Sequence, residues 1–286
     1  MDIKAEIARL KQERNAVILA HNYQIPSVQD IADYRGDSLG LSMEAAATEA
    51  DVIVFCGVYF MAETAKILSP QKTVLIPDAM AGCPMADMIS AAQLRQLKAE
   101  HPGAGSMCYV NSTAAVKAEC DICCTSANAA EIAASYFPTE QEVIFVPDRN
   151  LAANVGEQLG RDFITWPGYC PTHERLLPEM VTAARERYPD AEILVHPECR
   201  PAVVALADRA LSTGGMLRYA GESPATEFVI GTETGMCYRL EQENPAKSFH
   251  ALSEIMICPN MKRTTLAKLH QALETMQPEV TVAPEL

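Results

Sequence analysis

The sequence predicts an α/β protein built from three similar parallel-sheet αβα units, arranged with pseudo-threefold symmetry around a central site. Three observations predict this fold. Short apolar runs alternate with Ala- and Leu-rich helical stretches along the 286 residues, the runs fall into three groups, and a Cys-Pro dipeptide recurs three times. Continuous apolar runs are typical of strands buried on both faces of a parallel sheet, and strand–helix alternation indicates βαβ units.

Nine apolar runs are the expected strands. They span 15–21, 51–57 and 72–78, then 105–111, 120–126 and 142–148, and finally 191–197, 227–233 and 253–259. The first strands of the groups end at His21, Tyr109 and His196, which are 88 and 87 residues apart. The second strands end near Gly57, Ser126 and Gly231, so the expected spacing inside a group is uneven. Such internal similarity predicts a repeated architecture with variable loops.

Helical stretches separate the expected strands. An amphipathic helix opens the chain, and further helices are expected at 38–50, 91–101, 128–137, 174–188 and 263–276. Short connections and the absence of a low-complexity linker favour three consecutive units. We expect a first unit at 1–84 with the C-terminal helix 259–286 packed back on it, a second at 85–171 and a third at 172–258. The alternative is three independent domains with ordinary loops.

Composition limits the partners and the compartment. The net charge of −14 argues against a nucleic acid or an anionic membrane as the main partner. No apolar stretch is long enough to cross a bilayer, and the charged N-terminal segment is unlike a signal peptide. A cytoplasmic protein is therefore expected. Because cytoplasmic thiols stay reduced, the ten cysteines are expected to be ligands, reactive groups or core residues, with a disulfide framework as the alternative.

The three Cys-Pro dipeptides place one cysteine near the end of each group of strands. They begin at Cys83, Cys170 and Cys258, at intervals of 87 and 88 residues. A structural zinc site usually takes four ligands in close pairs. Three distant thiolates suit a cubane iron–sulfur cluster with one iron free of cysteine, where that iron acts as a Lewis acid. The alternative is three small buried hydrophobic residues.

The other cysteines have a plainer interpretation. Cys120 and Cys123 form a CxxC pair in a segment that reads as a strand, so core filling is the favoured role. Cys56 and Cys108 lie inside apolar strands and are interpreted in the same way. Cys199, beside His196 and Glu198 in the sequence, is expected to support the site rather than to form it.

Hydroxyl residues stand at corresponding places in the three groups. Ser38, Ser126 and Thr213 each precede a helical or glycine-containing segment. One such residue would be an ordinary helix cap, whereas the same place also offers backbone N–H groups to an anion. Three in equivalent positions predict a site for a multiply anionic substrate, because ligands of open parallel sheets bind beyond the carboxyl ends of the strands.

The remaining strand-end groups can move protons. His21, His173 and His196 could carry protons or bind carboxylates, although a single histidine is more often structural. Tyr23 and Tyr109 can act as acids or as hydrogen-bond donors. Glu198 is the carboxylate that we expect to serve as a base.

These segments together resemble quinolinate synthase, the NadA family. The resemblance covers essentially the whole chain and is carried by HNYQ, GDSL, FMAETAKIL, AGCPMADM, YVNSTAAVKAECD, CTSANA, FVPDRNLAANV, WPGYCPTHE, HPEC, STGGM, GTETGM and CPNMKRTTL. It implies that iminoaspartate (iminosuccinate) and dihydroxyacetone phosphate condense to quinolinate, with release of phosphate and two waters, in the biosynthesis of NAD. It also implies functional coupling to an aspartate-oxidising enzyme that supplies iminoaspartate.

The resemblance assigns roles to individual residues. It implies a [4Fe–4S] cluster held by Cys83, Cys170 and Cys258. It implies catalytic roles for Glu198, Tyr23, Tyr109 and His173. The substrate-binding positions that it implies are His21, Ser38, Tyr109, Val110, Asn111, Ser126, His196, Pro197, Glu198 and Thr213. Two departures, Tyr59 where histidine is expected and Gly40 where a charge is common, touch none of these positions.

Two other classes of function remain open from the residues. An electron-transfer or redox-sensing iron–sulfur protein would need a fully cysteine-ligated cluster, whereas only three cysteines here are equivalent. A non-catalytic binder of phosphates or dicarboxylates would hold its ligand equally well without iron.

Overall fold

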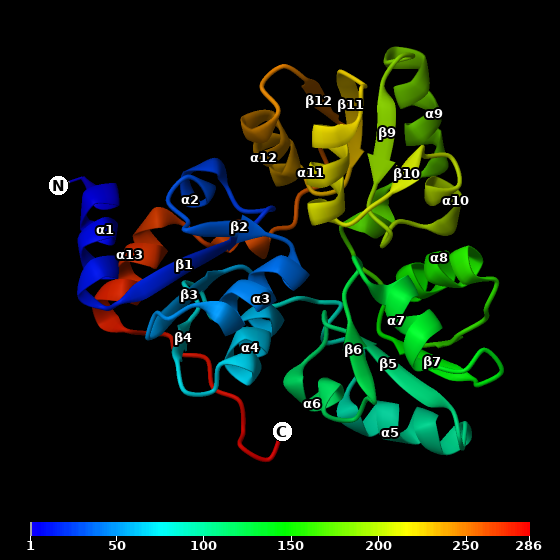
Figure 1. The fold of residues 1–286 in the computed structure, drawn as a ribbon, viewed down its shortest axis with the longest axis horizontal. Helices are drawn as coiled ribbons and strands as arrows, with labels where there is room; N and C mark the ends of the chain where they lie inside the picture. Colours follow the sequence, from blue (N-terminus) through cyan, green and yellow to red (C-terminus); the bar gives the residue numbers. More distant parts are fainter. Residues whose placement is uncertain (1) are drawn as a thin grey trace. The chain divides into compact units, whose positions relative to one another are not determined.

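The computed structural model describes residues 2–286 and contains three four-stranded sheets, all of them parallel (Figure 1). The predicted α/β class with three similar units is therefore confirmed. Two compact units divide the chain: residues up to 83 with 258–286, and residues 84–257. The first unit holds one sheet and the second unit holds two.

The sheet of the first unit has the strand order β2-β1-β3-β4. Its strands are β1 (Ala16–His21), β2 (Tyr34–Gly36), β3 (Val52–Cys56) and β4 (Thr73–Leu75). Its helices are α1 (Ile3–Glu13), α2 (Pro26–Gln29), α3 (Ser38–Ala47), α4 (Tyr59–Leu68) and, from the end of the chain, α13 (Leu266–Thr275), with the 3₁₀ helix η2 (Met261–Arg263) before it.

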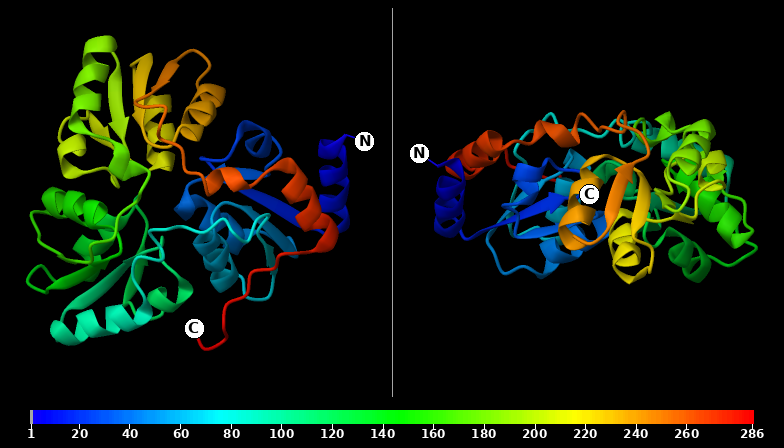
Figure 2. Two further views of the ribbon diagram at one scale, coloured as in Figure 1. Left: turned by 180° about the vertical axis from the view of Figure 1, so that it is seen from behind. Right: turned by 90° about the horizontal axis from the view of Figure 1, so that it is seen from above.

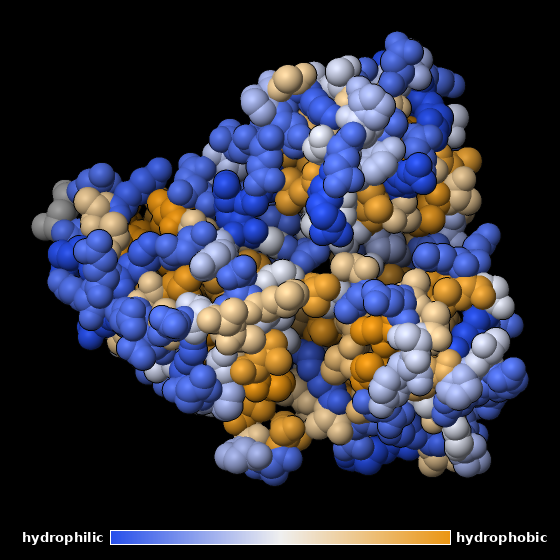
Figure 3. Space-filling view, viewed as in Figure 1, coloured by the Kyte–Doolittle hydropathy of each residue, from blue (hydrophilic) through white to orange (hydrophobic). Residues whose placement is uncertain are grey.

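Helices cover both faces of this sheet. Apolar residues of α1, α2 and α13 form one core with β1 and β3, while α3 and α4 pack together on the sheet. Two views show α13 beside α1 (Figures 1 and 2). Beyond α13, the segment around Val280 pairs with β4, where Val280 N–H donates to the Val74 carbonyl at 2.8 Å. Apolar residues gather near α4 in Figure 3, and Ile67 and Leu68 at its end are exposed.

The second sheet has the order β6-β5-β7-β8, and the third has the order β10-β9-β11-β12. The second is built from β5 (Gly105–Tyr109), β6 (Ile122–Cys124), β7 (Val143–Val146), β8 (Ile164–Thr165), α5 (Ala91–Glu100), α6 (Ala114–Lys117), α7 (Ala129–Tyr136) and α8 (Arg149–Leu159). The third is built from η1 (His173–Arg175), α9 (Pro178–Arg187), β9 (Glu192–Val195), α10 (Pro201–Val204), β10 (Arg209–Ala210), α11 (Thr213–Glu222), β11 (Glu227–Gly231), α12 (Gly235–Glu243) and β12 (Ser248–Ala251).

Both sheets of the second unit repeat the layering of the first. Apolar residues of α5 and α6 form a core with β5 and β7, and those of α9 and α10 do the same with β9 and β11. The helix pairs α7–α8 and α11–α12 pack within themselves and against β7 and β12. In each sheet a long helix and a four-residue helix therefore cover the same face.

The same aspartate contact recurs in each sheet. The carboxylates of Asp33, Asp121 and Asp208 accept hydrogen bonds of 2.8, 2.7 and 2.7 Å from the backbone N–H of Ile18, Ser106 and Ile193, always 15 residues earlier. The aspartate N–H in turn donates to the carbonyl of that same residue in all three sheets. Each aspartate thus fastens the start of an edge strand to the first strand of its sheet.

Three sequence expectations about strands are wrong. The segment 253–259 is irregular, and the last strand is β12, which ends before it. The short edge strands β2, β8 and β10 were not expected, because two or three residues carry too little periodicity. The third error is the pairing of 120–126 with the second strands of the other groups. β6 is the counterpart of β2 and β10, and β7 is the counterpart of β3 and β11. With this matching the spacing inside each group becomes regular.

Candidate active site around Glu198

The Glu198 carboxylate is the meeting point of three polar side chains inside the second unit. The Tyr109 hydroxyl donates to Oε1 at 2.5 Å, and the Asn111 amide donates to the same oxygen at 3.3 Å. His173 Nδ1 lies 2.7 Å from Oε2. Tyr109 ends β5 of the second sheet, whereas Glu198 follows β9 of the third. The carboxyl ends of two sheets therefore meet at this carboxylate, as parallel-sheet chemistry predicts.

The loop that carries Glu198 is held on two sides. His196 Nδ1 accepts the Glu198 N–H at 3.2 Å, and the His196 carbonyl accepts the Cys199 N–H at 2.9 Å. From α8, Asn154 donates to the carbonyls of Pro197 and Cys199 at 2.8 and 2.9 Å, and Asn150 donates to the Glu198 carbonyl at 3.2 Å. Glu198 is only 3% exposed, so this backbone scaffold fixes where its charge lies.

Electrostatics keep the two central groups in opposite protonation states. Burial raises the pKa of Glu198, but the charges of His196 and His173 and the hydrogen bonds from His173 and Tyr109 outweigh it, and the net pKa falls below the usual glutamate range. Burial, followed by the Glu198 charge, raises the pKa of Tyr109 well above its usual value. Glu198 is therefore ionised and Tyr109 keeps its proton at neutral pH.

Two histidines connect this carboxylate to hydroxyl groups. His196 Nε2 lies 3.3 Å from Ser126 Oγ, and His173 Nε2 lies 2.8 Å from Thr232 Oγ1. The two imidazole rings stack with their centroids 4.7 Å apart. Both rings are buried, so each is held in one orientation with one nitrogen toward Glu198 and the other toward a hydroxyl.

Cys170 lies at the edge of the same group. Its sulfur is 3.1 Å from His173 Nδ1, and ligand atoms of Cys170, His173 and Glu198 all lie within 4.8 Å of one another. The Cys170 backbone N–H donates to Asp148 at 3.2 Å, and Asp148 also caps α8 by accepting the Leu151 N–H at 2.7 Å. Burial, then the Glu198 charge, raises the pKa of Asp148 well above its usual value.

A second group of predicted residues lies in the first unit. His21 and Tyr23 are buried, their rings meet edge to face with centroids 4.5 Å apart, and His21 Nδ1 accepts the Tyr23 N–H at 3.1 Å. Lys262, four residues after Cys258, donates to the Tyr23 carbonyl at 2.6 Å. The His21–Tyr23 contact repeats the one between His196 and Glu198. That the two groups of predicted residues share one site stays a prediction.

The hydroxyl residues Ser38 and Thr213 are not the residues that cap their helices. The side chains that cap α3 and α11 belong to Asp37 and Ser212, which accept the N–H groups of Gly40 and Gly215. Ser38 and Thr213 are instead the first helical residues, and Ser126 contacts His196. The capping alternative is therefore wrong for Ser38 and Thr213. Two further predicted positions act through their backbone, since Val110 N–H donates to the Cys124 carbonyl and Pro197 accepts from Asn154.

The Cys-Pro cysteines differ from most of the others in exposure. Cys83, Cys170 and Cys258 are all partly exposed, whereas Cys56, Cys108, Cys124 and Cys199 are buried. Burial raises the pKa of the Cys56 and Cys199 thiols, which disfavours the thiolate that binds a metal. Cys170 and Cys258 each begin a turn of the same kind. The Cys170 carbonyl accepts the N–H of Glu174, and the Cys258 carbonyl accepts the N–H of Lys262, in each case four residues later. The ligand atoms of Cys170, His173 and Glu198, which lie within 4.8 Å of one another, are compatible with a metal cofactor.

Cys123 corrects one sequence expectation. It is exposed on the edge strand β6, so core filling is wrong for this residue. Cys120 is partly exposed and packs against the core formed by α5, α6 and β5.

Several polar residues that hold the site were not expected from the sequence. They are buried or half-buried groups whose partners come from distant segments: Asp148, Asn150, Asn154, Glu174 and Thr232. Glu174 shows the pattern, because it accepts hydrogen bonds from Arg149 and Asn150 of α8 at 2.8 Å each. Their sequence signal is their place in FVPDRNLAANV, WPGYCPTHE and GTETGM.

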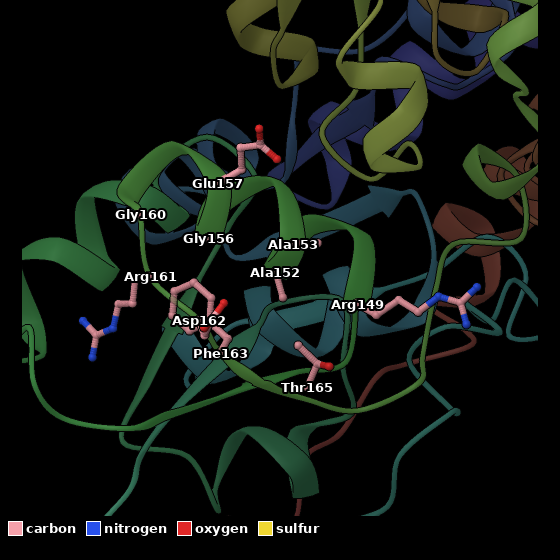
Figure 4. Close-up of a pocket in the computed structure, with 10 residues that line it drawn as sticks. All are labelled: Arg149, Ala152, Ala153, Gly156, Glu157, Gly160, Arg161, Asp162, Phe163 and Thr165. Atoms are coloured by element: carbon pink, nitrogen blue, oxygen red, sulfur yellow. The ribbon is translucent and has the colours of Figure 1, made fainter.

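A pocket of about 510 Å³ lies elsewhere on the second sheet. It runs along α8 and the segment that follows, and Figure 4 shows the side chains of Arg149 and Arg161 extending at its opposite ends. None of its lining residues is a predicted site residue. Among the described residues no helix is long and apolar enough to span a membrane.

Comparisons with known proteins agree with the resemblance. The family model described as "Quinolinate synthetase A protein" matches residues 5–286. The chain is 58% identical to the quinolinate synthase of Geobacter metallireducens and 56% identical to that of Dehalococcoides mccartyi, each over 284 residues that cover 99% of this chain and 93% of the relative. A relative from Methanoregula boonei with the same name is 53% identical over the same length.

Among solved structures, the E-1-hydroxy-2-methyl-but-2-enyl-4-diphosphate reductase of Plasmodium falciparum aligns with 96% of this chain and 82% of its own. The identity is 13% and the TM-score is 0.31, a likeness too low to bear on the site. The family match and the alignments with these relatives extend over nearly the whole chain. The chain therefore belongs to the quinolinate synthetase A family.

Proposed function

We propose that this chain is a quinolinate synthase, which condenses iminoaspartate with dihydroxyacetone phosphate to quinolinate and releases phosphate and two waters. The observation that carries the proposal is the ionised, buried Glu198, held between a protonated phenol and two histidines beside a partly exposed thiol. A ring-forming condensation with dehydration needs a base for carbon-bound protons and donors for developing oxyanions. The proposed cellular setting is the cytoplasm, with an aspartate-oxidising enzyme supplying iminoaspartate.

We further propose that Cys83, Cys170 and Cys258 hold a [4Fe–4S] cluster at the convergence of three αβα units related by pseudo-threefold symmetry. The three units would be 1–84 with 259–286, 85–171 and 172–258. The exposure and turn geometry of the Cys-Pro residues support this ligand set. When bound, an iron without a cysteine ligand supplies Lewis-acid polarisation of a substrate hydroxyl.

Side chains of the protein would carry out the proton transfers and orient the substrate. Glu198 takes the proton that is lost as the enamine and imine forms interconvert, and Tyr109 orients the substrate while its proton stays in place. His173 passes protons between Glu198 at Nδ1 and the Thr232 hydroxyl at Nε2. Asn111 Oδ1 is buried and lacks a hydrogen-bond partner among residues 2–286, so it offers an acceptor to a substrate N–H or O–H.

The substrate anions would meet hydroxyls and histidines. Ser126 and His196 form one such pair, and Ser38 and Thr213 stand at the first positions of α3 and α11, the end of a helix that favours anions. His21 and Tyr23 complete the proposed set from the first unit.

Anaerobic purification with iron and sulfide analysis, followed by a quinolinate assay, tests the proposal. The substrate iminoaspartate is generated in the assay by an aspartate-oxidising enzyme. We expect cluster iron and turnover in the wild type, loss of both in Cys83→Ala, and retention of both in Cys237→Ala, whose thiol lies in α12. Unimpaired turnover of Cys83→Ala would exclude the cluster mechanism. Ligand binding without turnover would favour a binding protein, and redox cycling without turnover would favour electron transfer.

A further inference from the structure

Four cysteines lie near one another at the edge of the second sheet: Cys108, Cys120, Cys123 and Cys124. Cys108 in β5 and Cys123 in β6 are direct partners in the parallel register. Residues paired in this way project their side chains to the same face, and adjacent strands are about 4.8 Å apart. That separation lies within the range of about 4.4–6.8 Å between the Cα atoms of natural disulfides.

The thiols of this group influence one another. Cys120 and Cys123 both shift the pKa of Cys108, and Cys108 shifts the pKa of Cys123. Cys108 is buried, Cys120 is partly exposed and Cys123 is exposed. A reagent in solution can therefore reach Cys123, and the buried Cys108 lies next to it to complete an exchange.

We propose that Cys108 and Cys123 are a redox-modification site, converted reversibly to a cross-strand disulfide by a low-molecular-weight disulfide of the glutathione class. In the first exchange the Cys123 sulfur, after losing its proton, attacks the external disulfide and releases one external thiol. In the second, the Cys108 sulfur loses its proton and displaces the other external thiol from Cys123. Two protein thiols give up two electrons and two protons, and the external disulfide takes them up as two thiols.

Charge and burial favour the oxidised form once it has formed. Hydrogen bonding to Cys120, together with burial, raises the pKa of Cys108 to about 12. Hydrogen bonding to Cys108 and burial also raise the pKa of Cys123, while the Lys117 charge acts in the opposite direction. A low thiol pKa stabilises the reduced form of a redox pair, as in strong oxidants, so thiols with raised pKa lack that stabilisation.

The modification would take place one residue from the Glu198 centre. The Cys108 sulfur also contacts the Tyr109 carbonyl at 3.3 Å. Disulfide formation redirects that sulfur toward β6 and removes the contact. Oxidation therefore changes the surroundings of Tyr109 first, and the Tyr109 hydroxyl is the group that donates to Glu198.

The positions of lysine and arginine make the pair easy to detect. Trypsin cuts after Lys98, Lys117 and Arg149, which places Cys108 in peptide 99–117 and Cys120, Cys123 and Cys124 in peptide 118–149. A disulfide from Cys108 joins the two peptides, whereas one within the CxxC pair leaves them separate. The cysteines proposed as cluster ligands lie outside both peptides.

The experiment equilibrates the anaerobically purified holoprotein with graded ratios of oxidised to reduced glutathione, blocks remaining thiols with iodoacetamide and maps tryptic peptides by mass spectrometry. We expect the joined peptides to increase with oxidised glutathione, to separate on addition of dithiothreitol, to persist in Cys120→Ser and to vanish in Cys123→Ser. Cys237→Ser is the matched control and should behave like the wild type. Absence of the joined peptides, their persistence in Cys123→Ser, or a disulfide confined to peptide 118–149 would overturn the proposal.

Discussion

Tyr109 and Glu198, 89 residues apart in the chain, are joined by a hydrogen bond of 2.5 Å between the tyrosine hydroxyl and the carboxylate. Neither residue exceeds 3% exposure. A charge-assisted bond of this length is among the stronger kinds in proteins. It ties the second sheet to the third at the point where we place the proton transfers.

Replacing Glu198 by glutamine keeps the size of the side chain and removes its charge. We expect kcat for quinolinate formation to fall by about 10²-fold or more, because general-base catalysis contributes roughly that factor. Iron content should stay at the wild-type level. Glu157→Gln, an exposed change on α8, is the control and should leave kcat unchanged. Normal turnover in Glu198→Gln would rule out its role as the base.

Asn154 holds the Glu198 loop through two carbonyls, those of Pro197 and Cys199. In Asn154→Ala these carbonyls lose their donor, and we expect the free energy of unfolding to fall by about 1–3 kcal/mol. Because the loop positions Glu198, which we propose as the base, kcat should fall with little change in KM. Gln158→Ala, at an exposed position of the same helix, should change neither quantity. Urea denaturation and steady-state kinetics give the two measurements, and an unchanged kcat in Asn154→Ala would limit its role to stability.

Gly168 lies two residues before Cys170 at a place where no side chain fits. A Cβ there would lie 2.6 Å from the Pro147 carbonyl oxygen. We expect Gly168→Ala to lower stability by about 1–3 kcal/mol and to reduce bound iron, because the segment leading to Cys170 must move.

Gly82, directly before Cys83, gives the matched control, since a Cβ there meets no atom within 4 Å. Gly82→Ala should bind iron normally. Equal iron content in the two variants would show that the close approach at Gly168 does not position Cys170. Thermal melting and iron analysis provide the measurements.

Asp208 predicts a pH-dependent contribution to stability. Burial raises the pKa of this carboxyl, but the hydrogen bonds from Arg185 and the Ile193 N–H outweigh it and hold the pKa below its usual value. Because the folded-state pKa is the lower one, the stabilisation is present above the unfolded pKa of about 3.9 and is lost as pH falls through the folded value.

The measurement is the difference in melting temperature between the wild type and Asp208→Asn. We expect the variant to melt lower by a constant amount above about pH 5, and the difference to shrink below about pH 4 as the wild-type carboxylate becomes protonated. A difference that grows toward acid pH would mean that the sign of the pKa shift is wrong.

The long central strands and their ends could be predicted from the sequence. β1, β5 and β9 are continuous apolar runs, and the residues at the ends of β5 and β9, Tyr109 and His196, do lie beside Glu198. The short edge strands could not be predicted, because β10 has two residues and owes its place to Asp208 rather than to periodicity. The error at β6 has the same origin, since its three residues resemble a central strand in composition.

Side-chain contacts between distant segments also could not be predicted from the sequence. Glu198 was identified as a base from its neighbours, but its ionisation depends on His173 and Tyr109, which come from other segments. Asn150 and Asn154 look like ordinary polar residues of a helix until the loop at Pro197 is seen against them. For Cys123, exposure follows from the position of β6 at the sheet edge, which composition does not reveal.

The aspartate contact shared by the three sheets gives a common reference point for comparing residue positions in them. Measured from Asp33, Asp121 and Asp208, the residues His21, Tyr109 and His196 occupy one equivalent position, and Tyr23, Asn111 and Glu198 occupy another. Such correspondence is what duplication of a single ancestral segment leaves behind. The second of these positions is a tyrosine, an asparagine and a glutamate in turn, so only the third sheet offers a carboxylate there.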